Sequence, residues 1–294
     1  VLQAVLAAEA EDDANIDFIP VEDYPIESNV GYYPGCVDYL DQEMVFSHVN
    51  EGEMNLGDAT TSAFTLFEAI DLDVSYLGRD FLKCCGHDQK WQGLTEVFEK
   101  LKAYNQKKIQ QSGIDTLVSS CAECFRTFAR DYELEDIKVM HTTEFLIEQG
   151  FDMNLKAEEE TTVTYHDPCR LGRQMGVYEE PRELIQSVEG VSIVEMEHSG
   201  EDAMCCGVSS MMSCNENARA LRVARMEEIK STGADTMLTA CPKCVTHFEC
   251  LKFEGDERYA DIKILDVVSF LAQQINEKKE NIGQTSVPVI ETEA

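Results

Sequence analysis

Ten of the twelve cysteines fall into two groups of five that share one spacing pattern. In the second group, 35 residues separate Cys169 from the pair Cys205-Cys206, and 34 separate that pair from Cys241-Pro242-Lys243-Cys244. In the first group, 47 residues separate Cys36 from Cys84-Cys85, and 35 separate that pair from Cys121-Ala122-Glu123-Cys124. A glycine follows each cysteine pair. Thiols in such numbers indicate a metal site or redox chemistry.

The make-up of each group favours iron–sulfur chemistry. A structural zinc site takes four ligands, usually as two C-x-x-C pairs, whereas each group here has one C-x-x-C, one adjacent pair and one single cysteine. Adjacent cysteines do not easily bind one small ion, but they can bind neighbouring irons of a larger cluster. A cubane cluster takes four thiolates, so five indicate a cluster that departs from the cubane. Zinc and redox-active dithiols remain open as alternatives.

The segments around the cysteines repeat as well. Residues 113–124 align without gaps on residues 233–244, and Ile137-Lys138-Val139 recurs as Ile262-Lys263-Ile264. Strands alternate with helices, which predicts parallel sheets with the cysteines at the carboxyl ends of strands. The predicted fold class is α/β, with two pseudo-symmetric repeats that each form a small, mostly parallel sheet with flanking helices.

The expected elements give the domain boundaries. We expect strands at 30–33, 73–77, 115–120, 139–141, 162–166, 192–196, 236–240 and 262–265, and helices at 60–69, 94–110, 143–149, 182–188, 217–230 and 267–274. The predicted division is an acidic N-terminal arm at 1–28, cysteine-rich domains at 29–157 and 158–275, and a polar tail at 276–294. Residues 41–57, which are polar and irregular, hold the extra length of the first group.

Composition restricts the class of protein. The formal net charge is −32, which argues against binding to nucleic acid or to an anionic membrane surface. The sequence contains no run of about 18 apolar residues, so we expect no membrane insertion. Two features argue against an extracellular disulfide framework. The sequence shows no basic leader, and vicinal Cys-Cys pairs seldom act as structural disulfides. We therefore expect a reduced, cytoplasmic protein.

The pattern C-x(n)-C-C-G-x(n)-C-x-x-C, present twice, resembles the cysteine-rich CCG domain over roughly residues 30–275. Within that family, the chain is similar to the B subunit of heterodisulfide reductase and to the C-terminal part of its D subunit. The resemblance implies a noncubane [4Fe–4S] cluster in each repeat and a catalytic subunit that reduces the mixed disulfide of coenzyme M and coenzyme B in methanogenesis. Carried over by position, the ligands would be Cys36, Cys84, Cys85, Cys121 and Cys124 for one cluster, and Cys169, Cys205, Cys206, Cys241 and Cys244 for the other.

Two departures from the family pattern stand out. The 47-residue spacer is longer than usual, and Gly207-Val208-Ser209-Ser210-Met211-Met212 stands where many relatives have a glycine run. Two complete cysteine groups favour disulfide reduction over simple electron relay. Cys214 and Cys250 fit neither group, and we interpret them as buried thiols.

An anionic disulfide requires local cations in so acidic a protein. Five basic residues lie within a few positions of the cysteines and are candidates for substrate binding, since guanidinium in particular suits sulfonate and phosphate: Lys83, Arg126, Arg170, Arg173 and Lys243. His87 and His166 flank the cysteine groups and are candidates for proton donors.

The electron source must be another protein. The chain has no flavin or nucleotide fingerprint and no ferredoxin-type C-x2-C-x2-C run. The family implies two further subunits, one ferredoxin-like and one flavin-bearing, with a hydrogenase or formate dehydrogenase behind them; a membrane cytochrome is the alternative. Two other functions stay open: an iron–sulfur electron-transfer subunit that acts on a quinone, flavin or other thiol or disulfide, and a structural zinc protein.

Overall fold

The computed structural model describes residues 26–35, 37, 58–78, 80–208, 215–253 and 257–282 of the 294-residue chain. Two four-stranded sheets form the frame, and every strand pair in them is parallel. The first sheet has the order β2-β1-β3-β4, and the second has the order β6-β5-β7-β8. The strands are β1 (Val30–Tyr33), β2 (Ser75–Tyr76), β3 (Thr116–Ser119), β4 (Lys138–His141), β5 (Lys156–His166), β6 (Glu189–Ile193), β7 (Thr236–Thr239) and β8 (Lys263–Asp266). The predicted α/β fold with two parallel repeats is confirmed.

Helices flank both sheets. In the first half they are α2 (Asp58–Ala69), α3 (His87–Trp91), α4 (Thr95–Ser112), α5 (Ala122–Asp131) and α6 (Thr142–Glu148). In the second half they are α7 (Gly172–Met175), α8 (Glu179–Gln186), α9 (Glu216–Ser231), α10 (Pro242–Phe253) and α11 (Val267–Ile282), with 3-10 turns η3 (Gly200–Asp202) and η4 (Glu257–Tyr259). No helix in the described residues is long and apolar enough to cross a membrane.

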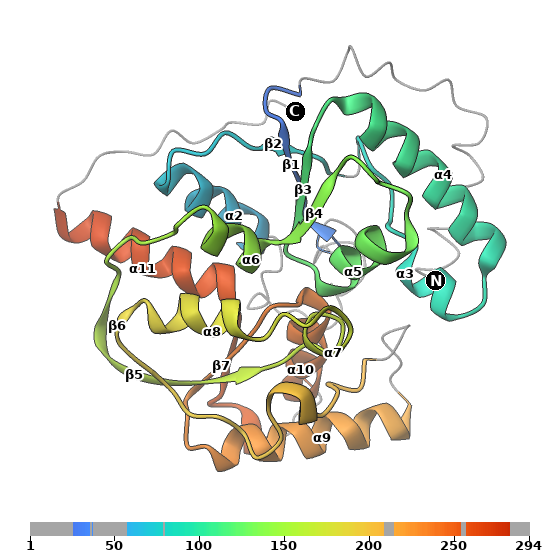
Figure 1. Cartoon of the computed structure of the whole chain (residues 1–294). Coiled ribbons are helices and arrows are strands. Elements are labelled where there is room, and N and C mark those ends of the chain that lie inside the picture. The colour runs from blue at the N-terminus through green and yellow to red at the C-terminus, as the bar shows by residue number, and fades with distance from the viewer. Residues whose placement is uncertain are drawn as a thin grey trace, which may run out of the picture.

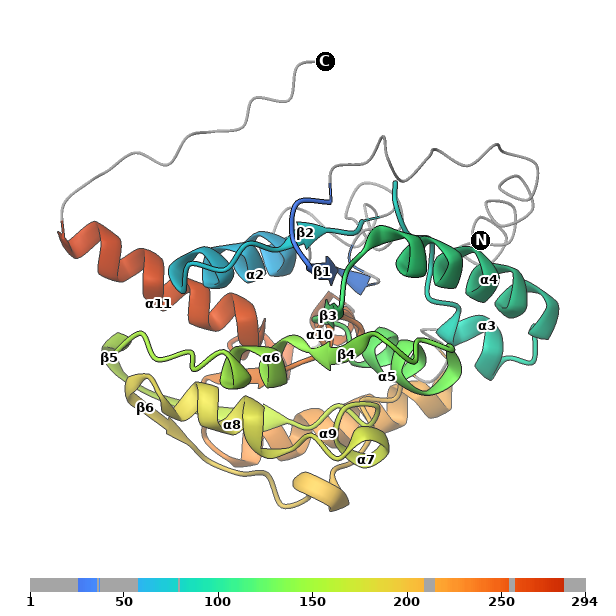
Figure 2. The same ribbon diagram turned by 45° about the horizontal axis from the view of Figure 1, so that its top comes forward.

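The two halves pack together through helices and share one core. Figure 1 shows the first half above the second, with the last helix, α11, reaching back to lie beside α2 of the first half. Figure 2 shows the same pairing after rotation, and α6 of the first half contacts α8 of the second. A continuous buried cluster runs from Tyr32 and Phe67 in the first half to Phe248 and Leu271 in the second. Burial of this kind removes the apolar faces of both sheets from water, as parallel sheets require.

The sheet registers fix which residues of the two halves are equivalent. Ser119 pairs with Tyr33 and His141, whereas Thr239 pairs with His166 and Asp266. Because Ser119 and Thr239 occupy the same place in the repeat, Tyr33 corresponds to His166, and His141 corresponds to Asp266.

Local sequence explains how the elements begin and end. Gly113, with φ of 80°, ends α4 in the left-handed conformation that glycine adopts without strain. His141 begins α6 by accepting a hydrogen bond from the Thr143 amide, and Glu144 completes this capping box.

Several boundaries differ from expectation. The β6 strand was expected at 192–196 but begins three residues earlier; it is an edge strand with exposed residues, which weakens its hydrophobic signal. The β5 strand, expected at 162–166, begins at Lys156, before the expected domain boundary after residue 157. Helix α11 continues to Ile282, past the expected start of the tail. The acidic arm at 1–28 and the irregular segment at 41–57 lie almost entirely outside the described residues.

Candidate functional site

The first cysteine group converges where β1, β2 and β3 end. Cys121 immediately precedes α5 and Cys124 lies in its first turn, while Cys84 and Cys85 occupy the loop before α3. The Cys85 thiol forms hydrogen bonds with Cys124 and Cys84, which lower its pKa. Cys36 lies outside the described residues. The chain just before it passes close to this group, because a Cβ added at Gly35 would lie 2.3 Å from Cys121 Cβ and 3.4 Å from Cys124 Sγ.

The second group converges in the same way at the ends of β5 and β7. Cys244 Sγ lies 3.4 Å from Cys206 Sγ, and Cys244 also forms a hydrogen bond with Cys241. The Cys205 thiol forms hydrogen bonds with Cys169 and Cys206. The hydrogen bond with Cys169 is the main cause that lowers the pKa of Cys205 to about 2, and it raises the pKa of Cys169. All five cysteines that the sequence grouped together therefore form one connected set.

The two groups meet at the interface between the halves. Cys121 of the first group forms a thiol–thiol hydrogen bond with Cys241 of the second. This bond joins the two groups, which together hold nine of the ten described cysteines. Most of them are buried, but Cys169 and Cys205 are partly exposed. The second group is therefore the less enclosed of the two.

Each cysteine pair sits in a loop shaped by its glycine. Gly86 and Gly207 have φ of 81° and 85°, in the left-handed region. This turn aims the Gly86 amide at Cys84 Sγ (3.5 Å) and the Gly207 amide at Cys205 Sγ (3.3 Å). A backbone N–H that donates to sulfur favours the thiolate, which is the form that binds metals.

The residues that hold these loops differ between the halves. In the first half, buried Asn105 on α4 donates to the Cys84 and Lys83 carbonyls and accepts from the Lys83 amide. Tyr132 donates to the Cys85 carbonyl. In the second half, the Cys206 carbonyl instead accepts a hydrogen bond from Nδ1 of His247, at 2.9 Å.

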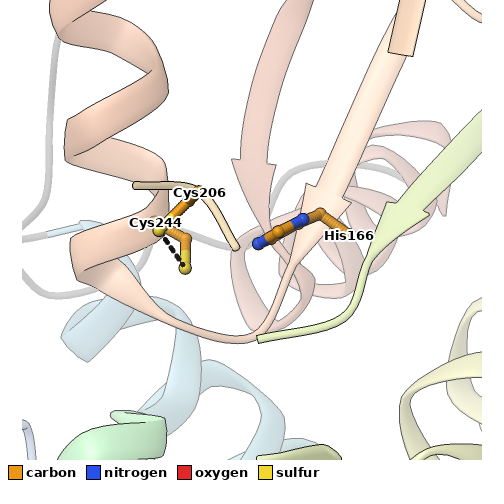
Figure 3. A group of neighbouring side chains, drawn as sticks. All are labelled: His166, Cys206 and Cys244. Atoms are coloured by element: carbon orange, nitrogen blue, oxygen red, sulfur yellow. Dashed lines mark hydrogen bonds between the residues drawn. The ribbon is translucent and has the colours of Figure 1, made fainter. Parts of the chain in front are cut away.

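His166 lies against the second thiol group. Figure 3 shows its ring at the end of β5, directed towards Cys206 and Cys244; one ligand atom from each residue lies within 4.8 Å of the others. Arg225 Nε donates to His166 Nδ1 at 3.1 Å, which leaves the ring proton on Nε2. Burial, with the Arg225 charge adding to it, lowers the pKa of His166 to about 3. The ring is therefore a neutral hydrogen-bond donor at neutral pH.

His87, the other predicted proton donor, belongs to a buried charge cluster between the halves. Its Nδ1 donates to a carboxylate oxygen of Asp88 (3.0 Å) and lies 3.3 Å from one of Glu123. Lys243 Nζ lies 2.5 Å from a carboxylate oxygen of Asp88 and 2.5 Å from one of Glu123. Glu123 and Lys243 occupy the same position in the two C-x-x-C segments. Burial raises the pKa of Glu123 in spite of the Lys243 charge. Two carboxylates therefore balance Lys243, which was predicted to bind substrate.

The other predicted basic residues have different surroundings. Arg173 donates to the Ala203 carbonyl, and Arg126 forms an ion pair with Asp131. Arg170 packs on the face of Trp91, with its guanidinium carbon 3.9 Å from the ring centroid. Lys83 lies beside Cys84, where Asn105 fixes its backbone.

Several residues of the site escaped the sequence analysis: Asn105, Glu123, Arg225, His247 and Trp91. A longer internal alignment would have found one contrast, since Asn105 and Arg225 both lie eight residues before the glycines at 113 and 233. Trp91 could have been singled out as the only tryptophan in the chain.

The donor set suits an iron–sulfur cluster better than zinc. Sulfur predominates, each group contains more thiols than one tetrahedral zinc takes, and backbone amides point at sulfur in both loops. Comparison with known proteins agrees. The model of the cysteine-rich (CCG) domain matches residues 30–129 and 163–249, which are the two repeats. The chain belongs to the CCG cysteine-rich domain family.

Several curated relatives are named as oxidoreductases or as subunits of them. The chain is 31% identical to the D subunit of dihydromethanophenazine:CoB–CoM heterodisulfide reductase of Methanosarcina acetivorans, over 85% of this chain and 59% of that protein. It is 33% identical to the B subunit of fumarate reductase (CoM/CoB) of Methanothermobacter marburgensis, over 64% of this chain and 38% of that protein. The probable iron-sulfur-binding oxidoreductase FadF of Bacillus subtilis is 30% identical over 61% of this chain and 26% of its own length. The chain thus spans less than two thirds of each of these relatives.

A solved structure shares the CCG fold of this chain. A hypothetical protein from Helicobacter pylori aligns with a TM-score of 0.57 over 95% of this chain and 55% of its own, at 11% identity. This likeness concerns the fold alone.

Proposed function

We propose that this chain is the catalytic subunit of a heterodisulfide reductase, which reduces the mixed disulfide of coenzyme M and coenzyme B to two thiols in methanogenesis. The observation that carries the proposal is the contact between Cys121 and Cys241, which joins two thiol groups into one site with an open edge at Cys169 and Cys205. A protein that only passes electrons through one cluster needs one such group. A site that cleaves a disulfide and holds both products has a use for two.

Two noncubane [4Fe–4S] clusters are the proposed cofactors. The ligands would be Cys36, Cys84, Cys85, Cys121 and Cys124 for the first, and Cys169, Cys205, Cys206, Cys241 and Cys244 for the second. When bound, the clusters supply electrons one at a time. Cleavage of the S–S bond takes up an electron pair and a pair of protons, and both sulfurs leave as thiols.

The chain's own residues would position the sulfurs and supply hydrogen bonds. Neutral His166, held by Arg225, presents Nε2–H in the second thiol group and can stabilise thiolate charge there. We propose His166 and His87 as the residues that deliver protons. Lys83, Arg126, Arg170, Arg173 and Lys243 are the proposed source of positive charge for the anionic substrate; Arg170 is the one that packs beside the open edge.

The proposed electron donors are other subunits, one ferredoxin-like and one flavin-bearing, with a hydrogenase or formate dehydrogenase behind them. The proposed location is the cytoplasm.

The second candidate is an iron–sulfur electron-transfer subunit of a larger oxidoreductase, which acts on a quinone, flavin or another thiol or disulfide. It is favoured by the similarity to FadF and to the B subunit of fumarate reductase, since similar cysteine-rich chains occur in differently named oxidoreductases.

One titration separates the two candidates. The protein is prepared anaerobically with clusters, its iron is counted, and the coenzyme M–coenzyme B disulfide is added while EPR spectra are recorded. We expect about eight irons per chain, with a paramagnetic signal that appears only on addition of the disulfide or its thiols. Full iron content without a substrate-dependent signal would favour the electron-transfer candidate. Zinc in place of iron would contradict both.

A further inference from the structure

Trp91 brings together two arginines from different halves of the molecule. It lies on α3, is 44% exposed, and is the only tryptophan in the chain. The Arg170 guanidinium lies 3.9 Å from its ring centroid and that of Arg126 lies at 5.5 Å. Arg170 directly follows Cys169 in the second half, and Arg126 belongs to α5 of the first half, two residues after Cys124. Figure 1 shows α3 and α5 close together, as their contacts require.

This arrangement stands at the open edge of the thiol site. Cys169 and Cys205 are the partly exposed thiols of the two groups within the described chain. Because Arg170 is the next residue after Cys169, the Cα atoms of the two residues are only about 4 Å apart. A molecule whose sulfur reaches this edge therefore meets the Arg170 side chain and the exposed ring of Trp91.

The charge on Arg170 is not balanced in the way that the neighbouring charges are. Asp131 pairs with both Arg126 and Lys90, and Lys243 pairs with Asp88 and Glu123. Among the residues that the structure describes, Arg170 makes no hydrogen bond or ion pair, and its guanidinium packs on the Trp91 ring. A cation–π contact holds a guanidinium in place while leaving its N–H edge able to bind an oxyanion.

We propose that Arg170, held by Trp91, is the specificity-determining residue for the substrate, and that it binds a sulfonate or similar oxyanion a few bonds from the reacting sulfur. The inference rests on the proposed function, because it deepens the account of the same site. The short chain distance from Cys169 to Arg170 selects small thiols and disulfides whose charge lies close to sulfur. A guanidinium can donate two parallel N–H bonds to two oxygens of a sulfonate, which an ammonium group cannot do with the same geometry.

Because Trp91 is the only tryptophan, its fluorescence reports on this site without any need for turnover. The cluster-loaded protein is titrated anaerobically with 2-mercaptoethanesulfonate and, separately, with the neutral analogue 2-mercaptoethanol. We expect a saturable emission change whose half-point lies at least tenfold lower for the sulfonate. Arg170→Gln should remove this preference, and Arg170→Lys should restore part of it. Arg258→Gln is the control, because Arg258 also stacks on an aromatic ring, that of Tyr259, and its loss changes the net charge equally.

Steady-state kinetics provide a second readout. In Arg170→Gln, the KM for the coenzyme M–coenzyme B disulfide should rise about tenfold, with a much smaller change in kcat. The preference for this disulfide over neutral bis(2-hydroxyethyl) disulfide should fall by a similar factor. Equal titration curves for the two thiols, or a preference retained by Arg170→Gln, would overturn the inference. A wild-type protein that reduces neither disulfide but still shows the sulfonate preference would overturn the proposed function and leave the anion site standing.

Discussion

Tyr33 ends strand β1 in the first half, and His166 ends the equivalent strand β5 in the second. The described thiols beside Tyr33 are all buried, whereas Cys169 and Cys205 in the group beside His166 are partly exposed. Tyr33 donates to the Lys83 carbonyl, so it fixes the backbone. His166 faces thiols and receives a hydrogen bond from Arg225. The frame is shared, but the first half is arranged to enclose its thiols and the second to present some of them.

The helix that covers each cysteine loop differs in the same sense. Asn105 of α4 binds loop backbone, whereas Arg225, at the same position in α9, binds His166 and the His198 carbonyl. The amide side chain of Asn105 thus holds the cysteine loop of the first half, and the guanidinium of Arg225 holds the His166 ring in the second. The repeat therefore fixes where the thiols lie, while single substitutions on nearby helices decide what surrounds them.

The Glu123–Lys243 pair marks a place where the two repeats carry different residues and contact each other. In a symmetric homodimer, equivalent positions carry the same residue, so an opposite-charge pair cannot form between them. Fusion of the two repeats in one chain allows a glutamate in one and a lysine in the other.

The largest expected effect comes from removing one thiol from each group. Cys85→Ser and Cys206→Ser should each lose about four irons, because each serine breaks one cluster, and each should abolish disulfide reduction. Iron analysis and turnover measure this. Cys250→Ser, which lies outside both groups, should keep full iron. If either group variant kept turnover, the proposal that both groups act together would be contradicted.

The next effect concerns the charge pair between the halves. Lys243→Met should reduce the free energy of unfolding by about 3–5 kcal/mol, because it leaves two carboxylates buried without their cation. Glu123→Gln should cost clearly less, since Asp88 still pairs with Lys243. Urea unfolding measures both.

The double variant and a surface control complete this comparison. Lys243→Met combined with Glu123→Gln should cost less than the sum of the single changes. Lys138→Met, which breaks the exposed Lys138–Glu148 pair, should cost no more than about 1 kcal/mol. Additive costs would mean that the buried pair does not couple the halves.

The two-sheet fold and the thiol groups could be predicted from the sequence. The spacing of the cysteines can be counted directly, and the alternation of strands and helices follows from local residue patterns. The structure brings Cys169, Cys205, Cys206, Cys241 and Cys244 together, which is consistent with the expected layout near the carboxyl ends of the strands. The helices α5 and α10, which begin directly after Cys121 and Cys241, were not expected, because the cysteines indicate a site rather than a helix.

The supporting residues could not be predicted in the same way. Asn105 is an unremarkable polar residue in an amphipathic helix, and only tertiary packing buries it against Lys83 and Cys84. The contacts of Lys243 with Asp88, and of Arg170 with Trp91, join segments that are remote in sequence. No local pattern encodes such pairs.

Stability should depend on pH in opposite directions through His141 and Asp266, which are equivalent in the two halves. Burial lowers the pKa of His141 to about 4 and raises that of Asp266 to about 7. The unfolded chain therefore binds more protons at His141, and stability from this group rises with pH between about 4 and 6.5. The folded chain binds more protons at Asp266, and stability from that group falls with pH between about 4 and 7.

Single asparagine variants separate these two slopes. Asp266→Asn, which keeps the acceptor for the Val268 amide, should leave the rising slope; His141→Asn should leave the falling one. Each difference should be on the order of 3 kcal/mol across its range, from the size of the pKa shifts. Urea unfolding at a series of pH values measures both. Parallel pH profiles for the two variants would show that these side chains do not control the pH dependence.

The smallest expected effect compares the glycines of the two cysteine loops. Alanine at either should cost about 1–2 kcal/mol for the left-handed backbone alone, since φ is 81° at Gly86 and 85° at Gly207. The neighbours then differ: a Cβ at Gly86 would lie 2.7 Å from the Phe98 ring, a side chain that can turn, whereas at Gly207 it would lie 2.6 Å from the Ala218 carbonyl oxygen, which belongs to the backbone of α9. Gly207→Ala should therefore be the more destabilising by about 1 kcal/mol, as measured by urea unfolding. Gly233→Ala, where a Cβ meets nothing within 4 Å, gives the cost of the backbone conformation by itself. If Gly86→Ala proved the worse of the two, the tighter packing would lie in the first half, and the enclosure of its thiols would depend on the α4 side chains rather than on the loop.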